Sequence, residues 1–523
     1  MFDLLIQGGE VIDGSRSKRR RADVGVCAGR IAAVGVLDKA EARVKIDATG
    51  KIVAPGFVDV HNHSDAWLLK TLHLTSKTLQ GFTTEVIMAD GISYAPVSPE
   101  TVHEWIVYCR GLNALRFEEY QGWSSLAEYM ALLDRTNVQN SIAHVPYANV
   151  RVLAAGYGRA APDDYQMRQI VAEIEVGMEA GAVGLSTGMD YIAQWFASTD
   201  ELVDACAPLV ANQGLYVTHM RYKRGTLPAL KEAVEIGRRA GVPVHISHLK
   251  GTSLQETEEI IRYIDTVAVN EVDFSFDVYP YLPGSTMLNY WLPYSVWEDG
   301  PLGVLAHLKR RDVRSQMNEN LRHVDLSQTH IAWVPGKENS VHQGKFLSDY
   351  VAETGLPAGD ALCNLLIEEN LGVLLVMRLG DDDLVAPFLA HDCYMMGTDG
   401  IYHEDGAIHP RQYGSAVRLL GPAVRDKGWL TLEDAVYKLS AYPAQRFGLL
   451  ERGLVCEGYW ADLVVFDADT VTDRATFADP HQTAVGVEHV VVNGVPIVCD
   501  GVPVEEFGGP LPGRALRFKQ KVV

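Results

Sequence analysis

The chain has 523 residues, of which 47% are hydrophobic and 22% are charged, a balance typical of a globular protein with a large core. Its formal net charge of −21 argues against nucleic acid or an anionic membrane as the main partner. The seven cysteines are scattered and form no CxxC pair, so a disulfide framework or a zinc ribbon is not expected. The N-terminus lacks a signal-peptide pattern and no apolar run approaches the roughly 20 residues of a membrane span, so we expect a cytoplasmic protein.

The first sixty residues are predicted to form short strands joined by hairpins. Apolar segments at 2–7, 10–14, 24–26 and 31–34 are separated by glycine-containing turns. The far end of the chain has the same character. Strands are predicted at 463–466, 489–492 and 495–498, the last two joined by an Asn-Gly turn. We therefore expect a small β-sandwich built from both termini, residues 1–56 and 450–523.

The middle of the chain alternates strands with helices. Short strands are predicted at 58–60, 83–89, 142–145, 183–186, 215–218 and 244–247. Helical spacing of apolar residues covers 164–180 and 227–240, and a glycine follows each segment. This rhythm indicates an α/β fold with a parallel sheet. The length, and the lack of a GxGxxG after an early strand, favour a (β/α)₈ TIM-type barrel over residues 57–449.

The alternation of predicted strands and helices stops between residues 285 and 346. This stretch contains three tryptophans, several prolines and a helical piece near 304–320. We interpret it as an insertion over one end of the barrel, where such segments often act as lids.

Two histidines follow the first strand of the middle region. In a strand, residues two apart point to the same side, so His61 and His63 can reach one metal ion. Three more strands end in a residue type that binds metals: His219, His248 and Asp399. Because active sites of such barrels lie at the carboxyl ends of the strands, these side chains are expected to converge.

The motifs resemble those of the amidohydrolase superfamily, and within it the N-acyl-D-amino-acid deacylase (D-aminoacylase) branch. The resemblance covers almost the whole chain. It rests on APGFVDVHNHSD (54–65), GFTT (81–84), GLSTG (184–188), THMR (218–221), ISHLK (246–250), DVYPY (277–281), GTDG (397–400), HPR (409–411) and WADLVVF (460–466).

The resemblance implies a metal-dependent hydrolase that cleaves a linear amide, with His61, His63 and Asp399 on one ion and His219 and His248 on a second. The branch supplies a cysteine as a further ligand, and Asp90 stands at the matching position here. Glu85 is the rival carboxylate, but it lies five residues earlier, further from the strand end. The expected cofactor is one or two divalent ions, Zn²⁺ before Mn²⁺ or Co²⁺, and a carboxylate ligand weakens the selectivity for zinc.

The expected mechanism uses metal-activated water. A metal ion lowers the pKa of bound water from about 15.7 towards 7 and polarises the scissile carbonyl. Asp399 would accept the proton of the water and return it to the leaving amine. By resemblance, Lys250, Tyr281 and Arg411 would hold a free carboxylate of a small-molecule substrate.

The sequence departs from the branch in two places, at Asp90 and at residues 145–149, where the branch has a Gly-His-Gly stretch. These departures bear on the substrate more than on the reaction. The alternatives are hydrolysis of a cyclic amide, carbamate or urea, and a non-catalytic metal-binding barrel protein. The sequence leaves a monomer and a homo-oligomer both open.

Overall fold

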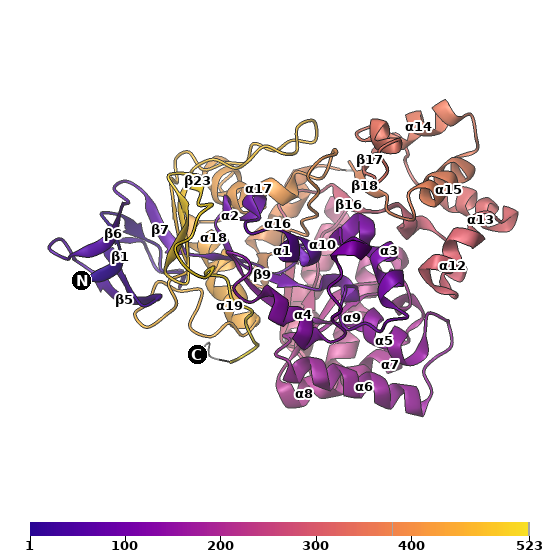
Figure 1. Ribbon diagram of the computed structural model, residues 1–523, viewed down its shortest axis with the longest axis horizontal. Coiled ribbons are helices and arrows are strands. Elements are labelled where there is room, and N and C mark those ends of the chain that lie inside the picture. The colour runs from indigo at the N-terminus through magenta and orange to yellow at the C-terminus, as the bar shows by residue number, and fades with distance from the viewer. Residues whose placement is uncertain (379, 521–523) are drawn as a thin grey trace.

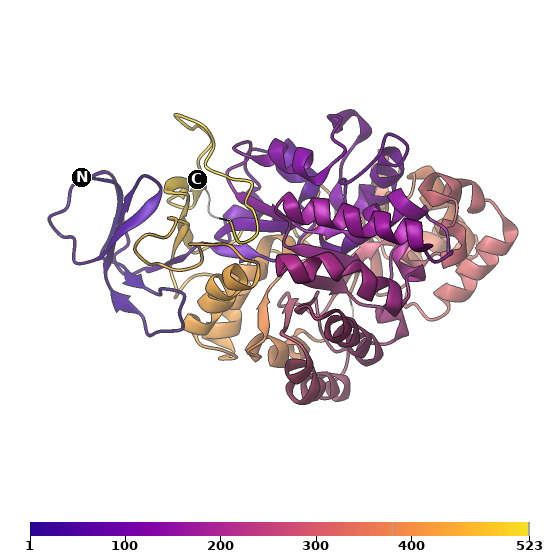
Figure 2. The same cartoon turned by 90° about the horizontal axis from the view of Figure 1, so that it is seen from below.

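The computed structural model describes residues 1–378 and 380–520. Figures 1 and 2 show strands from both ends of the chain grouped at one end of the molecule, and the segment around residues 300–370 at the opposite end. Helices and parallel strands lie between these two parts. The predicted α/β class is confirmed. No helix in the described part of the chain combines the length and the apolarity needed to cross a bilayer.

Parallel strands form the middle of the molecule in two hydrogen-bonded sheets. The first has the order β10-β9-β8, and the second β11-β12-β13-β14-β15-β19. Their bounds are β8 Phe57–Asp59, β9 Phe82–Ile87, β10 Asn140–Ala143, β11 Val145–Pro146, β12 Gly184–Gly188, β13 Leu215–His219, β14 Val244–Ile246, β15 Phe274–Val278 and β19 Tyr394–Met396. The strands predicted in this region are confirmed within a few residues.

Backbone contacts link these two sheets at both of their edges. Only His144 separates β10 from β11, and its N–H donates a 3.1 Å hydrogen bond to the carbonyl of Ile87 in β9. At the other edge, the N–H of Val60 donates to the carbonyl of Met396 at 3.3 Å. A parallel bridge between Asn62 and Gly400 follows. The loops after β8 and β19 therefore lie side by side.

The helices predicted between the strands are present and have clear end signals. α6 (Asp164–Glu179) begins after Asp163, whose carboxylate accepts from the N–H groups of Tyr165 and Gln166. α9 (Thr226–Ala240) ends at Gly241, which has a φ of +72° and a backbone N–H bonded to the carbonyl of Gly237. Other α-helices of at least eight residues in the described part of this region are α3 Val102–Asn113, α4 Leu126–Leu133, α5 Tyr147–Ala155, α10 Leu254–Tyr263, α17 Arg411–Arg418 and α18 Leu432–Leu439.

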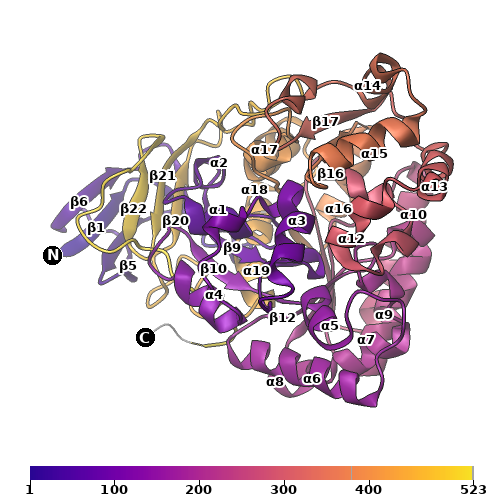
Figure 3. The same cartoon turned by 45° about the vertical axis from the view of Figure 1, so that its right-hand side comes forward.

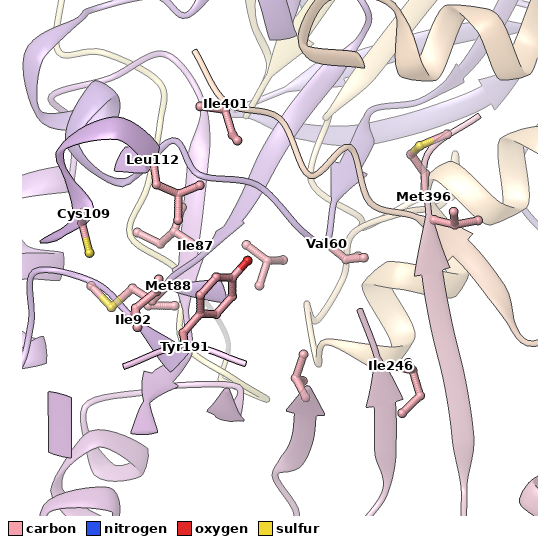
Figure 4. Packing of buried hydrophobic residues seen from close by; sticks show 14 of the residues in the cluster. Val60, Ile87, Met88, Ile92, Cys109, Leu112, Tyr191, Ile246, Met396 and Ile401 are labelled. Atoms are coloured by element: carbon pink, nitrogen blue, oxygen red, sulfur yellow. The ribbon is translucent and has the colours of Figure 1, made fainter. Parts of the chain in front are cut away.

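Side chains around the strand ends are part of one large hydrophobic core. Figure 4 shows Val60, Ile246 and Met396 beside the ends of three parallel strands. All three are at most 2% exposed. Strand ends packed in this way give a rigid base for the loops that follow them.

The two chain ends share one sheet. β7 (Ile52–Pro55) pairs antiparallel with β20 (Leu463–Phe466), with Val53 opposite Val465. This sheet also contains β2 Glu10–Val11, β3 Arg20–Arg21, β21 Val487–Val492, β22 Val495–Cys499 and β23 Val502–Pro503, and a second sheet contains β1 Phe2–Gln7, β4 Asp23–Cys27, β5 Arg30–Gly35 and β6 Ala42–Asp47. Apolar side chains from both sheets form a second hydrophobic cluster.

The predicted Asn-Gly hairpin joins β21 to β22. Val492 pairs with Val495, which leaves Asn493 and Gly494 as the two-residue turn. Their φ angles are +49° and +81°, so both central residues are in the left-handed region that a type I′ turn requires.

Residues 285–346, predicted to be an insertion, take part in an antiparallel sheet that extends beyond them. This sheet contains β16 (Gly284–Met287), β18 (Leu374–Met377) and β17 (Thr329–Trp333), in that order. The predicted helical piece near 304–320 is two helices, α12 Gly300–His307 and α13 Arg311–Leu321. Figure 3 shows these helices with α14 (Leu347–Thr354) and α15 (Ala358–Glu368) on the same side of the molecule.

Candidate metal centre

Strand ends from distant parts of the chain bring ligand-type side chains together. His61 and His63 follow β8, Asp90 follows β9, His219 ends β13, His248 follows β14 and Asp399 follows β19. Ligand atoms of His61, His63 and Asp90 lie within 4.8 Å of one another, and so do those of Asp90, His219 and His248. Asp90 belongs to both groups.

The two oxygens of Asp90 face different imidazoles. Oδ1 lies 3.5 Å from Nε2 of His61 and 4.0 Å from Nε2 of His248, and Oδ2 lies 3.7 Å from Nε2 of His63. The rings of His219 and His248 approach at 3.0 Å between Nδ1 and Nε2. One carboxylate therefore stands between two pairs of imidazoles, as a ligand shared by two ions would.

Asp399 lies beside the first histidine pair. Its Oδ1 is 3.2 Å from Nε2 of His63 and 3.8 Å from Nε2 of His61, and its Oδ2 is 2.8 Å from Nη1 of Arg411. Burial works to raise the pKa of the Asp399 carboxyl, but Arg411 and the nearby imidazoles hold it well below its usual range. Asp399 is therefore a carboxylate at neutral pH.

The donor set fits a divalent metal ion. Both ring nitrogens of His61 and of His63, and Oδ1 of Asp90, are buried and have no hydrogen-bond partner among the described residues. Buried polar atoms without a partner are rare and call for a ligand. Imidazole nitrogen with carboxylate oxygen is the ligand combination typical of catalytic zinc, and it also suits Mn²⁺ and Co²⁺.

Electrostatics at the site also favour a cation. Burial works to lower the pKa of His61, but the carboxylates of Asp90, Asp277 and Asp399 raise it to about 10. The carboxylates around His61 therefore favour a positive charge at this site. Burial and the neighbouring ring of His219 lower the pKa of His248 to about 3, which favours the neutral imidazole that binds a metal.

Three of these side chains are held by an uncommon backbone conformation. Asp90, His248 and Asp399 have φ angles of +58°, +40° and +48°. The left-handed region is uncommon for residues other than glycine, although Asp and His adopt it more readily than most. Such backbone conformations cluster at functional sites, where they aim side chains.

A layer of acidic groups behind the site orients the imidazoles. Oδ2 of Asp277 lies 3.5 Å from Nδ1 of His61 and 2.9 Å from Nε2 of His245, and Oδ1 accepts from the N–H of His248 at 2.9 Å. Asp190 Oδ2 lies 3.3 Å from Nε2 of His219. Carboxylates of this kind fix which ring nitrogen faces a metal.

A buried lysine ties the two loops that carry His61 and Asp399. Lys77 donates to the carboxylate of Asp59 and to the hydroxyl of Thr398. Thr398 in turn donates to Asp59 from its backbone N–H at 2.8 Å and from its hydroxyl at 2.6 Å. The ends of β8 and β19 are thereby fixed to each other two residues before His61 and one residue before Asp399.

Glu85, the rival to Asp90, lies outside the ligand cluster. It is buried, accepts from Nε2 of Gln139 at 3.0 Å and lies 3.9 Å from Lys77. Burial raises its pKa to about 8. The geometry therefore favours Asp90.

A cavity of about 300 Å³ opens onto the ligand cluster. Besides ligand residues, its lining includes Leu112, Tyr191, Tyr222, Thr226, Lys250, Thr252, Tyr279, Gly284, Ser285, Thr286, Tyr290 and Met377. Lys250 donates to the hydroxyl of Tyr279 at 2.6 Å. Burial and the neighbouring guanidinium of Arg411 lower the pKa of Lys250 to about 7.

Tyr281 does not line the cavity, contrary to the role in substrate binding predicted from the sequence. Its hydroxyl donates to Asp473 at 3.1 Å, and Tyr279 lines the cavity in its place. The reason is local, because the N–H of Tyr281 bonds to the carbonyl of Tyr279 at 2.9 Å. This tight turn at Pro280 directs the second tyrosine away from the cavity.

Arg411 is buried beside the cavity. In addition to its contact with Asp399, its guanidinium lies 4.4 Å from the centre of the Tyr279 ring. Its contact with a substrate carboxylate stays a prediction. Tyr279, Asp190 and Asp277 were not predicted as site residues. In the structure Asp277 and Tyr279 lie at the end of β15 and Asp190 lies two residues after β12, so they share the strand-end position of the histidines.

Comparison with known proteins agrees with this geometry. Residues 45–284 and 389–498 match the model of the amidohydrolase family. A D-aminoacylase from Alcaligenes xylosoxydans xylosoxydans is 36% identical, over 98% of this chain and 97% of the relative. An N-acyl-D-glutamate deacylase from the same organism is 35% identical, over 99% and 96%.

Solved structures give the same result. A Bordetella bronchiseptica N-acyl-D-glutamate deacylase, crystallised with zinc and a phosphonate inhibitor, superposes with a TM-score of 0.83 at 32% identity and covers 99% of both chains. A D-aminoacylase superposes at 0.80 with 34% identity, over 99% of this chain and 100% of the other. The chain belongs to the amidohydrolase family, as its sequence motifs predicted.

Proposed function

We propose that this chain is a metal-dependent amidohydrolase that hydrolyses the amide bond of N-acyl-D-amino acids. The observation that carries the proposal is the position of Asp90 between two histidine pairs, with Asp399 beside one of them. The choice of N-acyl amino acids of the D series is supported by the names of the two relatives.

Two groups of side chains would hold divalent ions, zinc first among them. Asp90 with His61, His63 and Asp399 would hold one ion, and Asp90 with His219 and His248 would hold the other. A bound divalent ion of this kind supplies Lewis acidity and makes water acidic enough to act as a nucleophile at neutral pH.

Asp399 transfers the proton. Its Oδ2 is paired with Arg411 and its Oδ1 faces His63, which holds the carboxylate beside the ligand cluster, where it accepts the proton of the attacking water. The same carboxyl group then protonates the leaving nitrogen, because an amine anion is a very poor leaving group. Arg411 keeps the carboxylate ionised before the reaction begins and fixes its orientation.

Lys250 and Tyr279 hold the substrate carboxylate. The two side chains already touch, and both line the cavity next to the ligand cluster. A lysine ammonium and a tyrosine hydroxyl can donate to the two oxygens of one carboxylate. Anchoring this group on one side of the cavity orients the scissile amide toward Asp399.

The fold is part of the proposal. The two parallel sheets, linked at both edges, form a (β/α)₈ barrel over residues 57–449, with an insertion that reaches β18. The two sheets built by residues 1–56 and 450–523 form a β-sandwich around the second hydrophobic cluster.

The test is a hydrolysis screen in buffer supplemented with Zn²⁺, Mn²⁺ or Co²⁺. The panel contains N-acetyl and N-formyl derivatives of D- and L-amino acids beside cyclic amides. We expect turnover of the D derivatives, and an Asp399→Asn variant, which keeps the shape of the side chain, should lose it. Turnover confined to cyclic amides, or no turnover of any N-acyl amino acid, would overturn the proposal.

A further inference from the structure

A second cavity, of about 580 Å³, lies beside the end of α3 and has no role in the proposed reaction. It is bordered by α1 (Asp65–Lys70), the end of α3 and the segment after it, the end of β17 and the loop after β19. A 3.0 Å hydrogen bond between Nε2 of His403 and the carbonyl of Gly111 joins two of these walls. In residues 1–378 and 380–520, its lining shares no residue with the cavity at the ligand cluster. The two cavities are therefore separate.

Arg110 is a cation of this second cavity without an acidic partner. No carboxylate oxygen lies within 4.0 Å of its side-chain nitrogens in the part of the chain that the structure describes. Its Nη1 donates to the carbonyl of Ala114 at 2.7 Å, the one acceptor that its guanidinium has among the described residues. A guanidinium has five N–H donors, so most of them remain available to a ligand. Burial also lowers the pKa of Arg110, as expected of a cation without a close counter-charge.

The other two cations of the second cavity share one acidic partner. Nζ of Lys70 lies 3.0 Å from Oε2 of Glu119, and Nη2 of Arg116 lies 2.7 Å from Oε1 of the same carboxylate. Lys70 also donates to the carbonyl of Ala114 at 2.7 Å. An anion that enters the second cavity therefore finds its free partner in Arg110.

The charges on the lining favour an anion with a single charge. Basic and acidic side chains are present in equal numbers: Lys70, Arg110, Arg116, Glu119, Glu404 and Asp405. Burial lowers the pKa of His403 to about 3, so its imidazole adds no charge at neutral pH. A monoanion can pair with Arg110, whereas a dianion would bring a second charge close to the acidic side chains without gaining a second free cation.

Two indole rings give the second cavity a flat apolar surface. Nε1 of Trp67 donates to the carbonyl of Tyr402 at 2.7 Å, and Nε1 of Trp333 donates to Asp405 at 2.9 Å. Because both polar N–H groups are occupied, the rings offer carbon atoms to a ligand and no hydrogen bonds. Cζ of Arg110 lies 5.5 Å from the centre of the Trp333 ring. The free cation thus adjoins the aromatic wall.

We infer that the second cavity is a further ligand site, which binds a small aromatic carboxylate with one negative charge. The carboxylate pairs with Arg110, whose planar arrangement of N–H groups matches two carboxylate oxygens. The ring of the ligand packs against the indoles of Trp67 and Trp333. This inference depends on the composition of the second cavity and is independent of the proposed hydrolysis.

Crystals of the wild-type chain soaked in 4-iodobenzoate give the first test, because anomalous scattering locates the iodine without any variant. We expect iodine in the second cavity and the carboxylate within hydrogen-bond distance of Arg110. Iodine that is absent from this cavity would overturn the inference, whether or not it is found at the ligand cluster.

Calorimetry with 4-iodobenzoate tests binding in solution. The wild type should bind it with a Kd of about 1 mM or tighter. Arg110→Met should weaken this binding about tenfold or more, because a charge-assisted contact is lost. Arg310→Met is the matched control, since Arg310 pairs with Asp312 on the surface, and it should bind as the wild type does. Equal affinity in all three proteins would mean binding at crystal concentration only and would overturn the inference.

Two other anions test the class of ligand. Acetate, which has the carboxylate without the ring, should bind about tenfold or more weakly than 4-iodobenzoate, since it gains no contact with the indoles. An excess of inorganic phosphate, a dianion at alkaline pH, should not displace 4-iodobenzoate. Acetate binding of equal strength, or displacement by phosphate, would overturn the choice of an aromatic monocarboxylate. None of these measurements involves turnover, so their failure leaves the proposed function untouched.

Discussion

The guanidinium of Arg411 lies 2.8 Å from the carboxylate of Asp399, and neither side chain is more than 9% exposed. Buried charge pairs of this kind are strongly coupled, and removing one partner leaves the other charge uncompensated. Arg411 therefore controls the ionisation of the group that we propose to transfer the proton. This role differs from the sequence prediction, in which Arg411 binds the carboxylate of the substrate.

Arg411→Met should lower kcat at least 100-fold and shift the acidic limb of the pH profile. In the folded protein the pKa of Asp399 is held well below its usual range, so the carboxylate persists as the pH falls. Without Arg411 this pKa rises, and activity is lost at a higher pH on the acidic side. The measurement is kcat/KM against pH for the wild type and the variant.

Two comparisons distinguish an effect of Arg411 on Asp399 from direct binding of the substrate carboxylate by Arg411. If Arg411 acts through Asp399, turnover falls equally on N-acetyl-D-methionine and on its amide, which has no free carboxylate. A loss confined to the free acid, with the acidic limb unmoved, would instead support contact with the substrate carboxylate. Arg418→Met is a matched control, because Arg418 pairs with Asp382 and Asp473 away from the cavity.

Replacing Asp90 should reduce metal content more than any change at Glu85. Asp90→Ala removes the carboxylate shared by both ligand groups, so we expect the purified variant to retain at most half of the metal of the wild type. Glu85→Gln should retain all of it, because Glu85 lies outside the cluster. Elemental analysis after dialysis gives both values, and a metal-depleted Glu85→Gln with a metal-replete Asp90→Ala would reverse the assignment.

Asp90→Cys adds a spectroscopic test of the same position. A thiolate is a softer ligand than a carboxylate and forms charge-transfer bands with Co²⁺. The cobalt-loaded variant should therefore show near-ultraviolet absorption that the cobalt-loaded wild type lacks. Identical spectra would mean that the side chain at position 90 does not bind the ion.

Asp190→Asn should weaken metal binding at the second histidine pair. Its carboxylate lies 3.3 Å from Nε2 of His219, which leaves Nδ1 to face His248 and the ligand cluster. Loss of such an orienting group typically costs about 10- to 100-fold in metal affinity. Competition with a chelator measures the affinity. Tyr290→Phe, which removes a different hydrogen bond to the Asp190 carboxylate, should leave the metal affinity within a few-fold.

The strand-end pattern predicted the residues that the structure brings together, because strand position determines which face and which end a side chain occupies. His61, His63, His219, His248 and Asp399 were all identified in this way. The pattern failed where a local turn intervenes. Tyr279 and Tyr281 are equivalent in an extended chain, and only the hydrogen bond across Pro280 distinguishes them.

The pairing of strands that lie far apart in the chain was the other feature that could not be predicted from the sequence. β16 pairs with β18, whose residues lie about ninety positions later in the chain, with Gly284 opposite Met377. Neither strand has a short turn that would indicate its partner, so this pairing was not predicted. Met377, which lines the cavity beside the ligand cluster, was missed for this reason.

Glu85→Gln should make the fold more stable at alkaline pH. Burial raises the pKa of Glu85 to about 8, against an ordinary value of 4.5. Between these values the folded chain binds a proton at Glu85 that the unfolded chain has released, so the wild type loses stability as the pH rises from 4.5 to 8. Glutamine cannot titrate, so the variant does not lose stability in this way.

The difference in unfolding free energy between variant and wild type should grow by up to about 1.4 kcal/mol per pH unit between pH 4.5 and 8 and stay constant above pH 8. Denaturant unfolding of both proteins in a metal chelator at pH 5, 6, 7, 8 and 9 gives the difference. Because all other titrating groups are common to the two chains, a difference that does not change with pH would show that Glu85 is ionised in the folded protein.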